Sequence, residues 1–325
     1  MTEKSGLIHF RATDGESLSG TWFTSPTSSR APGILVVVVG GAGIPAILYR
    51  GLACYLADHG AAVLTFDYRG IGASRQGSLR DFRAGIEDWG TRDLSAALAL
   101  ARTAYPGLPI NVIAHSIGTL LVGAARGVGE VSRAVFFGPH TAYYGDYRAP
   151  WRLPLYALWH LFMPAVTKIV GYFPARALGL GQDLPRQVAL DWARRRQPEL
   201  VANRGDHDRF AAILCGYGDL QARTLAISVS DDAFAPPAAG QRLLGLYPNI
   251  NASHEVITPA SQGERHLGHF AFIRRPASLY FWDRAMAWLL PSSEDGRASH
   301  QTTSRGVPPS GTKEDVLAGS TTPLT

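Results

Sequence analysis

A run of β-branched residues, GILVVVV at 33–39, constrains the fold of this chain most strongly. A strand with one face in water alternates apolar and polar residues, so an uninterrupted run predicts a strand that is covered on both faces. Similar apolar runs follow at 61–68, 110–115 and 131–138, separated by turns and helical segments. Strands that alternate with helices predict an α/β fold with a doubly wound, mostly parallel sheet.

The alternation stops in the middle of the chain and later resumes. Residues 141–205 contain helical apolar runs broken by prolines and no clear buried strand, so we expect an inserted helical cap here. The α/β core then comprises residues 1–140 and 206–290. Residues 291–325 lack aromatic residues and are rich in Ser, Thr, Gly and Pro, which predicts a disordered tail.

Composition narrows the class of protein further. Hydrophobic residues make up 46% of the chain and charged residues 18%, so the chain is expected to fold. The net charge is +5, but the basic residues are dispersed, and we expect no nucleic-acid partner. Cys54 and Cys215 permit at most one disulfide and form no CxxC pair, which predicts free thiols in a reducing compartment.

Targeting signals are not evident in the sequence. The start, MTEKSGLIHF, has no apolar segment typical of a secretory signal, so we expect a cytoplasmic protein. The stretch at 151–173 is apolar enough to resemble a membrane span, but it contains Arg152, Lys168 and two prolines. A charge at bilayer depth costs about 3 kcal/mol, so we expect no membrane span and interpret this stretch as a buried or interfacial helix.

The segment AHSIG at 114–118 carries the clearest chemical signal. It lies between a predicted strand and a predicted helix and matches the nucleophile elbow G-x-S-x-G, with Ala114 in place of the first glycine. Small residues are needed two positions before and after the serine, because strand and helix nearly touch there. Ala114 and Gly118 meet this requirement, so Ser116 is the predicted nucleophile.

Together with this elbow, the segments GGAGIPAILYRGLACYL, FDYRGIGAS and GYFPARALGLGQDLP resemble the α/β-hydrolase superfamily over residues 5–290. The narrower resemblance is to bacterial predicted α/β hydrolases allied to the serine aminopeptidase-like (S33-type) hydrolases. The resemblance implies a serine hydrolase that needs no metal or organic cofactor and acts on a small-molecule acyl substrate. It also implies a catalytic triad in the chain order Ser, Asp or Glu, His.

Two candidates exist for each of the other triad positions. Asp232 stands four residues before Pro236 and matches the family's D-x-x-V-P turn, whereas a register error of one residue would select Asp231. In HLGHF at 266–270, His269 resembles the catalytic histidine and His266 is the alternative. The two histidines also have metal-pair spacing, but no suitable third ligand lies nearby in sequence, so we expect no metal site.

The tetrahedral intermediate of acyl transfer needs hydrogen-bond donors for its oxyanion. The backbone N–H of Ile117, which follows the nucleophile, is one expected donor. The second is the N–H of Ala42 in the turn GGAG at 40–43, which lacks the lysine and the spacing of a phosphate-binding loop. Arg69, in the turn RGIGAS, is assigned no chemistry.

The composition of residues 141–200 bears on the substrate. Its aromatic side chains are expected either to line an acyl pocket or to pack in a core. Few carboxylates are present to hold a substrate ammonium, which favours an ester or thioester of a small or medium apolar acyl group over a peptide. Two alternatives remain, an acyltransferase that uses the same triad and a catalytically silent binding module. The sequence does not indicate the oligomeric state.

Overall fold

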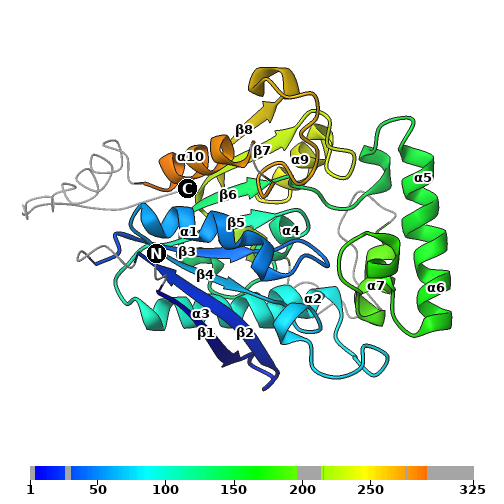
Figure 1. Ribbon diagram of the computed structural model, residues 1–325, viewed down its shortest axis with the longest axis horizontal. Coiled ribbons are helices and arrows are strands. Elements are labelled where there is room, and N and C mark those ends of the chain that lie inside the picture. Colours follow the sequence, from blue (N-terminus) through cyan, green and yellow to red (C-terminus); the bar gives the residue numbers. More distant parts are fainter. Residues whose placement is uncertain (1–3, 26–30, 196–213, 215, 275–276, 291–325) are drawn as a thin grey trace, which may run out of the picture. The chain divides into compact units, whose positions relative to one another are not determined.

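The computed structural model describes residues 4–25, 31–195, 214, 216–274 and 277–290 (Figure 1). One eight-stranded sheet has the order β1-β2-β4-β3-β5-β6-β7-β8. β2 pairs antiparallel with both β1 and β4, and all other neighbours are parallel, which confirms the predicted α/β fold. The strands are β1 Lys4–Arg11, β2 Ser17–Thr24, β3 Ile34–Val39, β4 Ala61–Phe66, β5 Ile110–His115, β6 Val131–Phe137, β7 Arg223–Val229 and β8 Asn251–Ile257.

Helices cover both faces of the sheet, as the unbroken apolar strands require. Every residue of β3, β4 and β5 is buried. Along β3, Leu35 and Val37 face one core and Val36 and Val38 face the other, because successive side chains point to opposite faces. The long helices of the two layers are α1 Arg50–Asp58 and α10 Ser278–Leu289 on one face, and α3 Ser95–Ala104 and α9 Pro237–Leu244 on the other.

Shorter helical segments complete the connections. A helical stretch leads into α3 through α2 Ile86–Asp88 and the π-helical segment η3 Trp89–Leu94. Helix α4 Gly118–Val122 follows β5. The 3₁₀ turns are η1 Ala46–Tyr49, η2 Gly72–Ser74, η4 Val128–Glu130, η5 Tyr144–Asp146, η7 Ala175–Leu178 and η8 Pro259–Gln262.

A helical insertion joins β6 to β7. It contains α5 Arg152–Ala157, the π-helical segment η6 Leu158–Phe162, α6 Met163–Val170 and α7 Arg186–Ala193. In Figure 1 these helices lie beyond the ends of β5 and β6 toward which the strand arrows point. The predicted end of the cap at residue 205 and the predicted tail at 291–325 lie outside the described residues.

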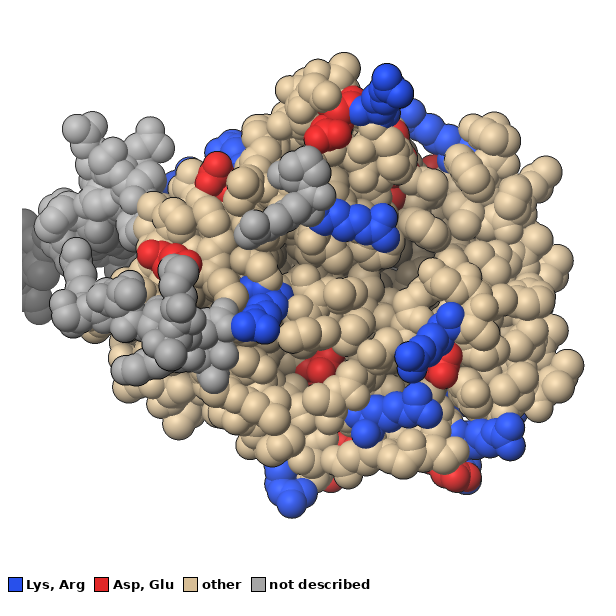
Figure 2. Space-filling view, in the orientation of Figure 1, with Lys and Arg blue, Asp and Glu red and all other residues tan. Residues whose placement is uncertain are grey.

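Residues Arg152–Val170 form one helix of 19 residues with mean hydropathy 1.3. By length and composition alone it could cross a membrane, and one such helix is weak evidence for a span. Only 28% of its most apolar window is buried, and Leu153 and Ile169 are exposed. Of the two predicted placements, a fully buried helix is therefore wrong, and an interfacial helix stays a prediction. In Figure 2 the surface where α5 and α6 lie is almost free of charged side chains, and the Lys and Arg residues elsewhere on this face are spread out.

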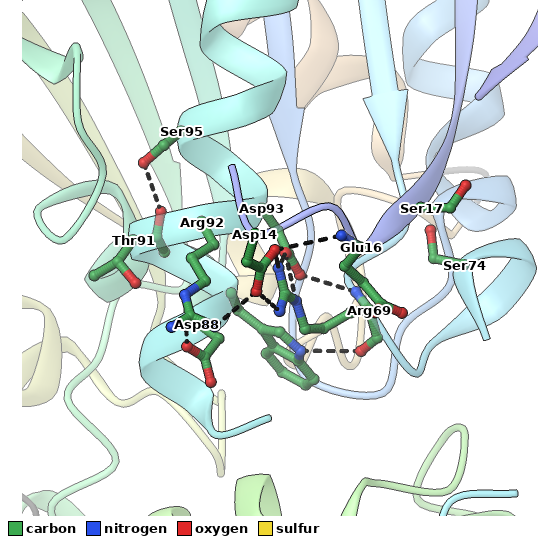
Figure 3. A network of polar contacts seen from close by, with 12 residues as sticks. Asp14, Glu16, Ser17, Arg69, Ser74, Asp88, Thr91, Arg92, Asp93 and Ser95 are labelled. Carbon is green, nitrogen blue, oxygen red and sulfur yellow. Dashed lines mark hydrogen bonds and ion pairs between the residues drawn. The ribbon is translucent and has the colours of Figure 1, made fainter. Parts of the chain in front are cut away.

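Arg69 is buried in a network of ion pairs that links three segments far apart in sequence (Figure 3). Its guanidinium contacts Asp14, in the β1–β2 turn, at 2.7 Å and Asp93, in η3, at 2.6 Å. Hydrogen bonding to Arg69 holds the pKa of the Asp14 carboxyl well below its usual range. Arg92 adds more exposed contacts to Asp14 and Asp88. The network therefore fixes the hairpin and the turn after β4 against η3.

Replacing Arg69 with methionine is expected to lower the free energy of unfolding by about 3–5 kcal/mol, because the buried Asp93 would lose its charged partner. Burial already raises the pKa of Asp93 to about 7, so the unpaired carboxyl would take up a proton. The side chains of Arg69 and Asp93 are 4% and 0% exposed. Arg92→Met is the matched control, since this side chain is 39% exposed and its ion pairs should contribute about 1 kcal/mol or less. Urea denaturation measures both changes, and equal effects of the two variants would contradict this assignment.

Candidate active site

Ser116 lies in a strained turn between β5 and α4. Its φ of 57° is in the left-handed region, which non-glycine residues rarely adopt. A Cβ at Gly118 would lie 2.6 Å from the carbonyl oxygen of Gly40 and 2.7 Å from that of Val39. Those oxygens belong to backbone that cannot move aside easily, so glycine is required there. Gly118 thus lets the strand and the helix approach closely, and Ser116, in the turn between them, lines a cavity.

The structure brings together Ser116, His269 and Asp232. His269 Nε2 lies 2.9 Å from Ser116 Oγ, and His269 Nδ1 lies 2.7 Å from Asp232 Oδ2. The other carboxylate oxygen, Oδ1, accepts hydrogen bonds from the N–H groups of Phe234 and Ala235, each at 2.8 Å. Burial opposes ionisation of Asp232, but His269 and the two N–H donors outweigh it and hold the pKa below its usual value. An ionised Asp232 fixes the proton of a neutral His269 on Nδ1 and leaves Nε2 free to accept.

The alternative candidates Asp231 and His266 pair with each other away from Ser116. His266 Nδ1 lies 2.6 Å from Asp231 Oδ2, and the histidine side chain is 73% exposed. Asp231 also accepts hydrogen bonds from the N–H groups of Leu267 and Gly268, at 3.1 and 3.0 Å. Asp231 therefore holds the loop that carries His269.

The two expected oxyanion donors flank the serine. Ala42 lines the same cavity as Ser116, and Ile117 is the next residue along the chain. Neither N–H donates a hydrogen bond to any residue within the described ranges. Both backbone donors are thus available to an incoming oxygen atom.

A buried chain of hydrogen bonds joins the glycine-rich turn to the loop of His269. The N–H of Gly41 donates to Tyr49 Oη at 2.9 Å, and Oη donates to His115 Nδ1 at 2.9 Å. His115 Nε2 then lies 3.3 Å from the carbonyl oxygen of His269. Burial raises the pKa of Tyr49 and lowers that of His115, so both groups stay neutral. His115, the residue before the nucleophile, thus connects two loops of the site.

The sequence analysis missed one residue at the centre of the site. This residue is His140, which follows β6. Its Nε2 lies 3.0 Å from Ser116 Oγ, and its other ring nitrogen, Nδ1, accepts a hydrogen bond from the N–H of Ala142. The position of His140 in the sequence could have indicated it. Ser116 follows β5 and His140 follows β6, its parallel neighbour, and the carboxyl ends of parallel strands meet at one edge of the sheet.

Ser116 opens into a cavity of about 570 Å³. Its lining is mostly apolar and combines the core with the insertion. Of the cap aromatics expected from the sequence, Trp159 and Phe173 line it, whereas Trp151 and Phe162 are exposed. Among the described lining residues there is no Asp, Glu or Lys, and Arg274 is the single arginine. Within the same described part of the chain, no group of three or more His, Cys, Asp or Glu is placed to hold a metal ion.

The sheet order, the strained serine after β5 and the histidine and aspartate after later strands define an α/β hydrolase. The sequence model of the family described as serine aminopeptidase, S33, matches residues 30–253. The chain therefore belongs to this family of serine hydrolases, which confirms the resemblance seen in its motifs.

Solved structures with this fold include several hydrolases of low sequence identity. A soluble variant of monoglyceride lipase from Saccharomyces cerevisiae, bound to a substrate analogue, has 16% identity and a TM-score of 0.60, covering 89% of this chain and 96% of that chain. An esterase from Pyrococcus furiosus has 16% identity and a TM-score of 0.55, covering 89% and 90%. A hypothetical protein from Pseudomonas aeruginosa has 15% identity and a TM-score of 0.57, covering 88% and 93%. At these identities the likeness concerns the fold. Among the curated proteins, no sequence matches the chain.

Proposed function

We propose that this hydrolase cleaves a carboxylic ester or thioester of an apolar acyl group through an acyl-enzyme on Ser116. The observation that carries the proposal is the continuous contact from Ser116 through His269 to Asp232 at the base of an apolar cavity. A hydroxyl is a weak nucleophile at neutral pH, so it requires this adjacent base and a third group that orients the base.

The reaction proceeds in two balanced steps. Ser116 Oγ attacks the acyl carbon and gives its proton to His269 Nε2, and the imidazolium then protonates the departing alcohol or thiol as its bond to the acyl carbon breaks. Water attacks the acyl carbon of the resulting acyl-enzyme and gives a proton to His269 Nε2. The bond from the acyl carbon to Oγ then breaks, and the imidazolium returns the proton to Oγ, which releases the acid and regenerates the serine hydroxyl. Asp232 stabilises the imidazolium in both steps, and the N–H groups of Ala42 and Ile117 bind the oxyanion.

The cavity lining supports an apolar acyl group. A free α-ammonium, as an aminopeptidase substrate carries, needs a carboxylate or comparable acceptor to replace its water, since burying an unpaired charge is costly. The described lining offers no Asp or Glu and is dominated by residues such as Ile44, Met163 and Leu184. We therefore favour esters over aminoacyl peptides, although the family takes its name from an aminopeptidase.

Turnover of p-nitrophenyl esters with acyl chains of increasing length tests this substrate class. We expect kcat/KM to rise about fourfold for each methylene that enters the cavity, because burying one methylene contributes about 0.8 kcal/mol. The rise should end once the chain exceeds the cavity. Aminoacyl p-nitroanilides with a free amine are the comparison, and faster turnover of these compounds than of the apolar esters would contradict the proposal.

The rival functions give different products. In the presence of an alcohol or amine acceptor, a hydrolase releases mainly the free acid, whereas an acyltransferase forms the acylated acceptor. A silent binding module would show neither product and no labelling of Ser116 by a fluorophosphonate. We place the reaction in the cytoplasm, which fractionation of the native host would test.

A further inference from the structure

The hydrogen bonds around His140 determine which of its nitrogens carries the proton. Its Nδ1 lies 3.0 Å from the backbone nitrogen of Ala142, which can only donate. Nδ1 must therefore be an unprotonated acceptor, and a neutral His140 carries its proton on Nε2. That Nε2–H points to Ser116 Oγ at 3.0 Å.

His140 and His269 thus have opposite roles at the same oxygen atom. His269 has its proton on Nδ1, facing Asp232, so its Nε2 accepts the proton of Ser116. His140 cannot act as that base, because its Nε2 already holds a proton. It also stays neutral, because burial lowers its pKa to about 3, and repulsion from Arg195 and from His269, once that ring is protonated, adds to this effect despite the opposing Asp232.

These two contacts leave Ser116 Oγ with one free direction. A hydroxyl oxygen has a bond to Cβ, a bond to hydrogen and two lone pairs. The hydrogen points to His269 and one lone pair accepts from His140, so only the second lone pair remains for attack on the acyl carbon.

We propose that His140 is a second catalytic histidine, a fixed hydrogen-bond donor to Ser116 Oγ that stabilises the charge on this oxygen when deacylation expels it. The inference rests on the proposed acyl-enzyme reaction. In the acyl-enzyme Oγ is an ester oxygen and a weak acceptor. As the bond from the acyl carbon to Oγ breaks, the electron pair returns to Oγ, which becomes a much stronger acceptor until His269 protonates it. The donor therefore stabilises the transition state of deacylation more than the ground state.

Backbone strain independently marks the residue that orients His140. In the described part of the chain, Ser116 and Ala142 are the two non-glycine residues with positive φ, at 57° and 61°. Such conformations cost energy and cluster at functional sites. Ser116 is the nucleophile, and Ala142 is the residue whose N–H fixes the tautomer of His140.

Substituting His140 separates this role from simple packing. His140→Phe keeps a planar ring against Trp192 but removes the donor. With p-nitrophenyl esters, whose good leaving group makes acylation fast, we expect kcat and KM both to fall by about 10- to 100-fold while kcat/KM stays nearly constant. Slower deacylation lowers both constants together, because the acyl-enzyme accumulates. His140→Gln, which places an N–H at a similar reach from the backbone, should recover most of kcat.

Rapid-mixing measurements of the p-nitrophenol burst, with mass spectrometry of the intact acyl-enzyme, provide the direct readout. If a larger fraction of His140→Phe than of the wild type is acylated, and if its acyl-enzyme decays more slowly, the proposal is supported. A fall of kcat/KM in parallel with kcat, or equal losses in the Phe and Gln variants, would show a structural role and overturn it. Active-site titration with a fluorophosphonate normalises the rates to folded enzyme. A wild type that neither turns over esters nor takes the label would instead refute the proposed function.

Discussion

Replacing Ser116 with alanine is expected to reduce kcat for p-nitrophenyl esters by about 10⁴-fold or more, because the variant has no atom that can form the acyl-enzyme. Any residual activity would come from the oxyanion donors Ala42 and Ile117 acting on bound substrate. KM should change much less, since the apolar lining of the cavity is untouched.

Stability measurements separate this loss from misfolding. Alanine keeps the Cβ, so the left-handed conformation at φ 57° has the same strain in Ser116→Ala as in the wild type, and Tm should be nearly unchanged. Ser116→Gly relieves that strain and should be equally inactive. Ser278→Ala, which changes a buried serine on α10, is the matched control and should retain activity. Fluorophosphonate labelling of Ser116→Ala would place the nucleophile elsewhere.

The strands could be predicted from the sequence because burial on both faces leaves a strong local pattern. The predicted strand at 33–39 begins one residue before β3 and ends with it, and the predicted strand at 110–115 coincides with β5. The elbow was also predictable, since the close approach of Gly118 to the backbone of Val39 and Gly40 demands a small residue whatever the rest of the fold. Each of these signals lies within a few residues of the feature it predicts.

Features that depend on contacts between distant segments were not predictable in this way. Arg69 resembled an ordinary turn residue, yet it lies between Asp14 and Asp93, 55 and 24 residues away. His140 lies 24 residues from Ser116, after a different strand, and its role depends on a tautomer fixed by the N–H of Ala142. The choice between adjacent aspartates likewise depended on which carboxylate the folded loop turns inward.

Asp232→Asn is expected to reduce kcat by about 10⁴-fold, by reversing the tautomer of His269. Oδ1 of Asp232 accepts from the N–H groups of Phe234 and Ala235, so the amide oxygen of asparagine must take this position. The NH₂ group then replaces Oδ2 and donates to His269 Nδ1, which forces the imidazole proton onto Nε2. His269 could then only donate to Ser116 Oγ, as His140 does, and no base would remain to accept the serine proton.

Asp231→Asn is the matched control, because it makes the same chemical change one residue away. Asp231 pairs with the exposed His266 and accepts from the N–H groups of Leu267 and Gly268, and asparagine retains one acceptor oxygen for these donors. We expect kcat to fall by no more than about tenfold, through loosening of the loop that carries His269. Steady-state kinetics of the two variants on one ester give the comparison. Equal losses of kcat would mean that both carboxylates act through the loop. A larger loss for Asp231→Asn would instead identify Asp231 as the triad acid. The reason is that only the carboxylate that fixes the tautomer of His269 can, when replaced by an amide, prevent this histidine from acting as a base without altering the fold.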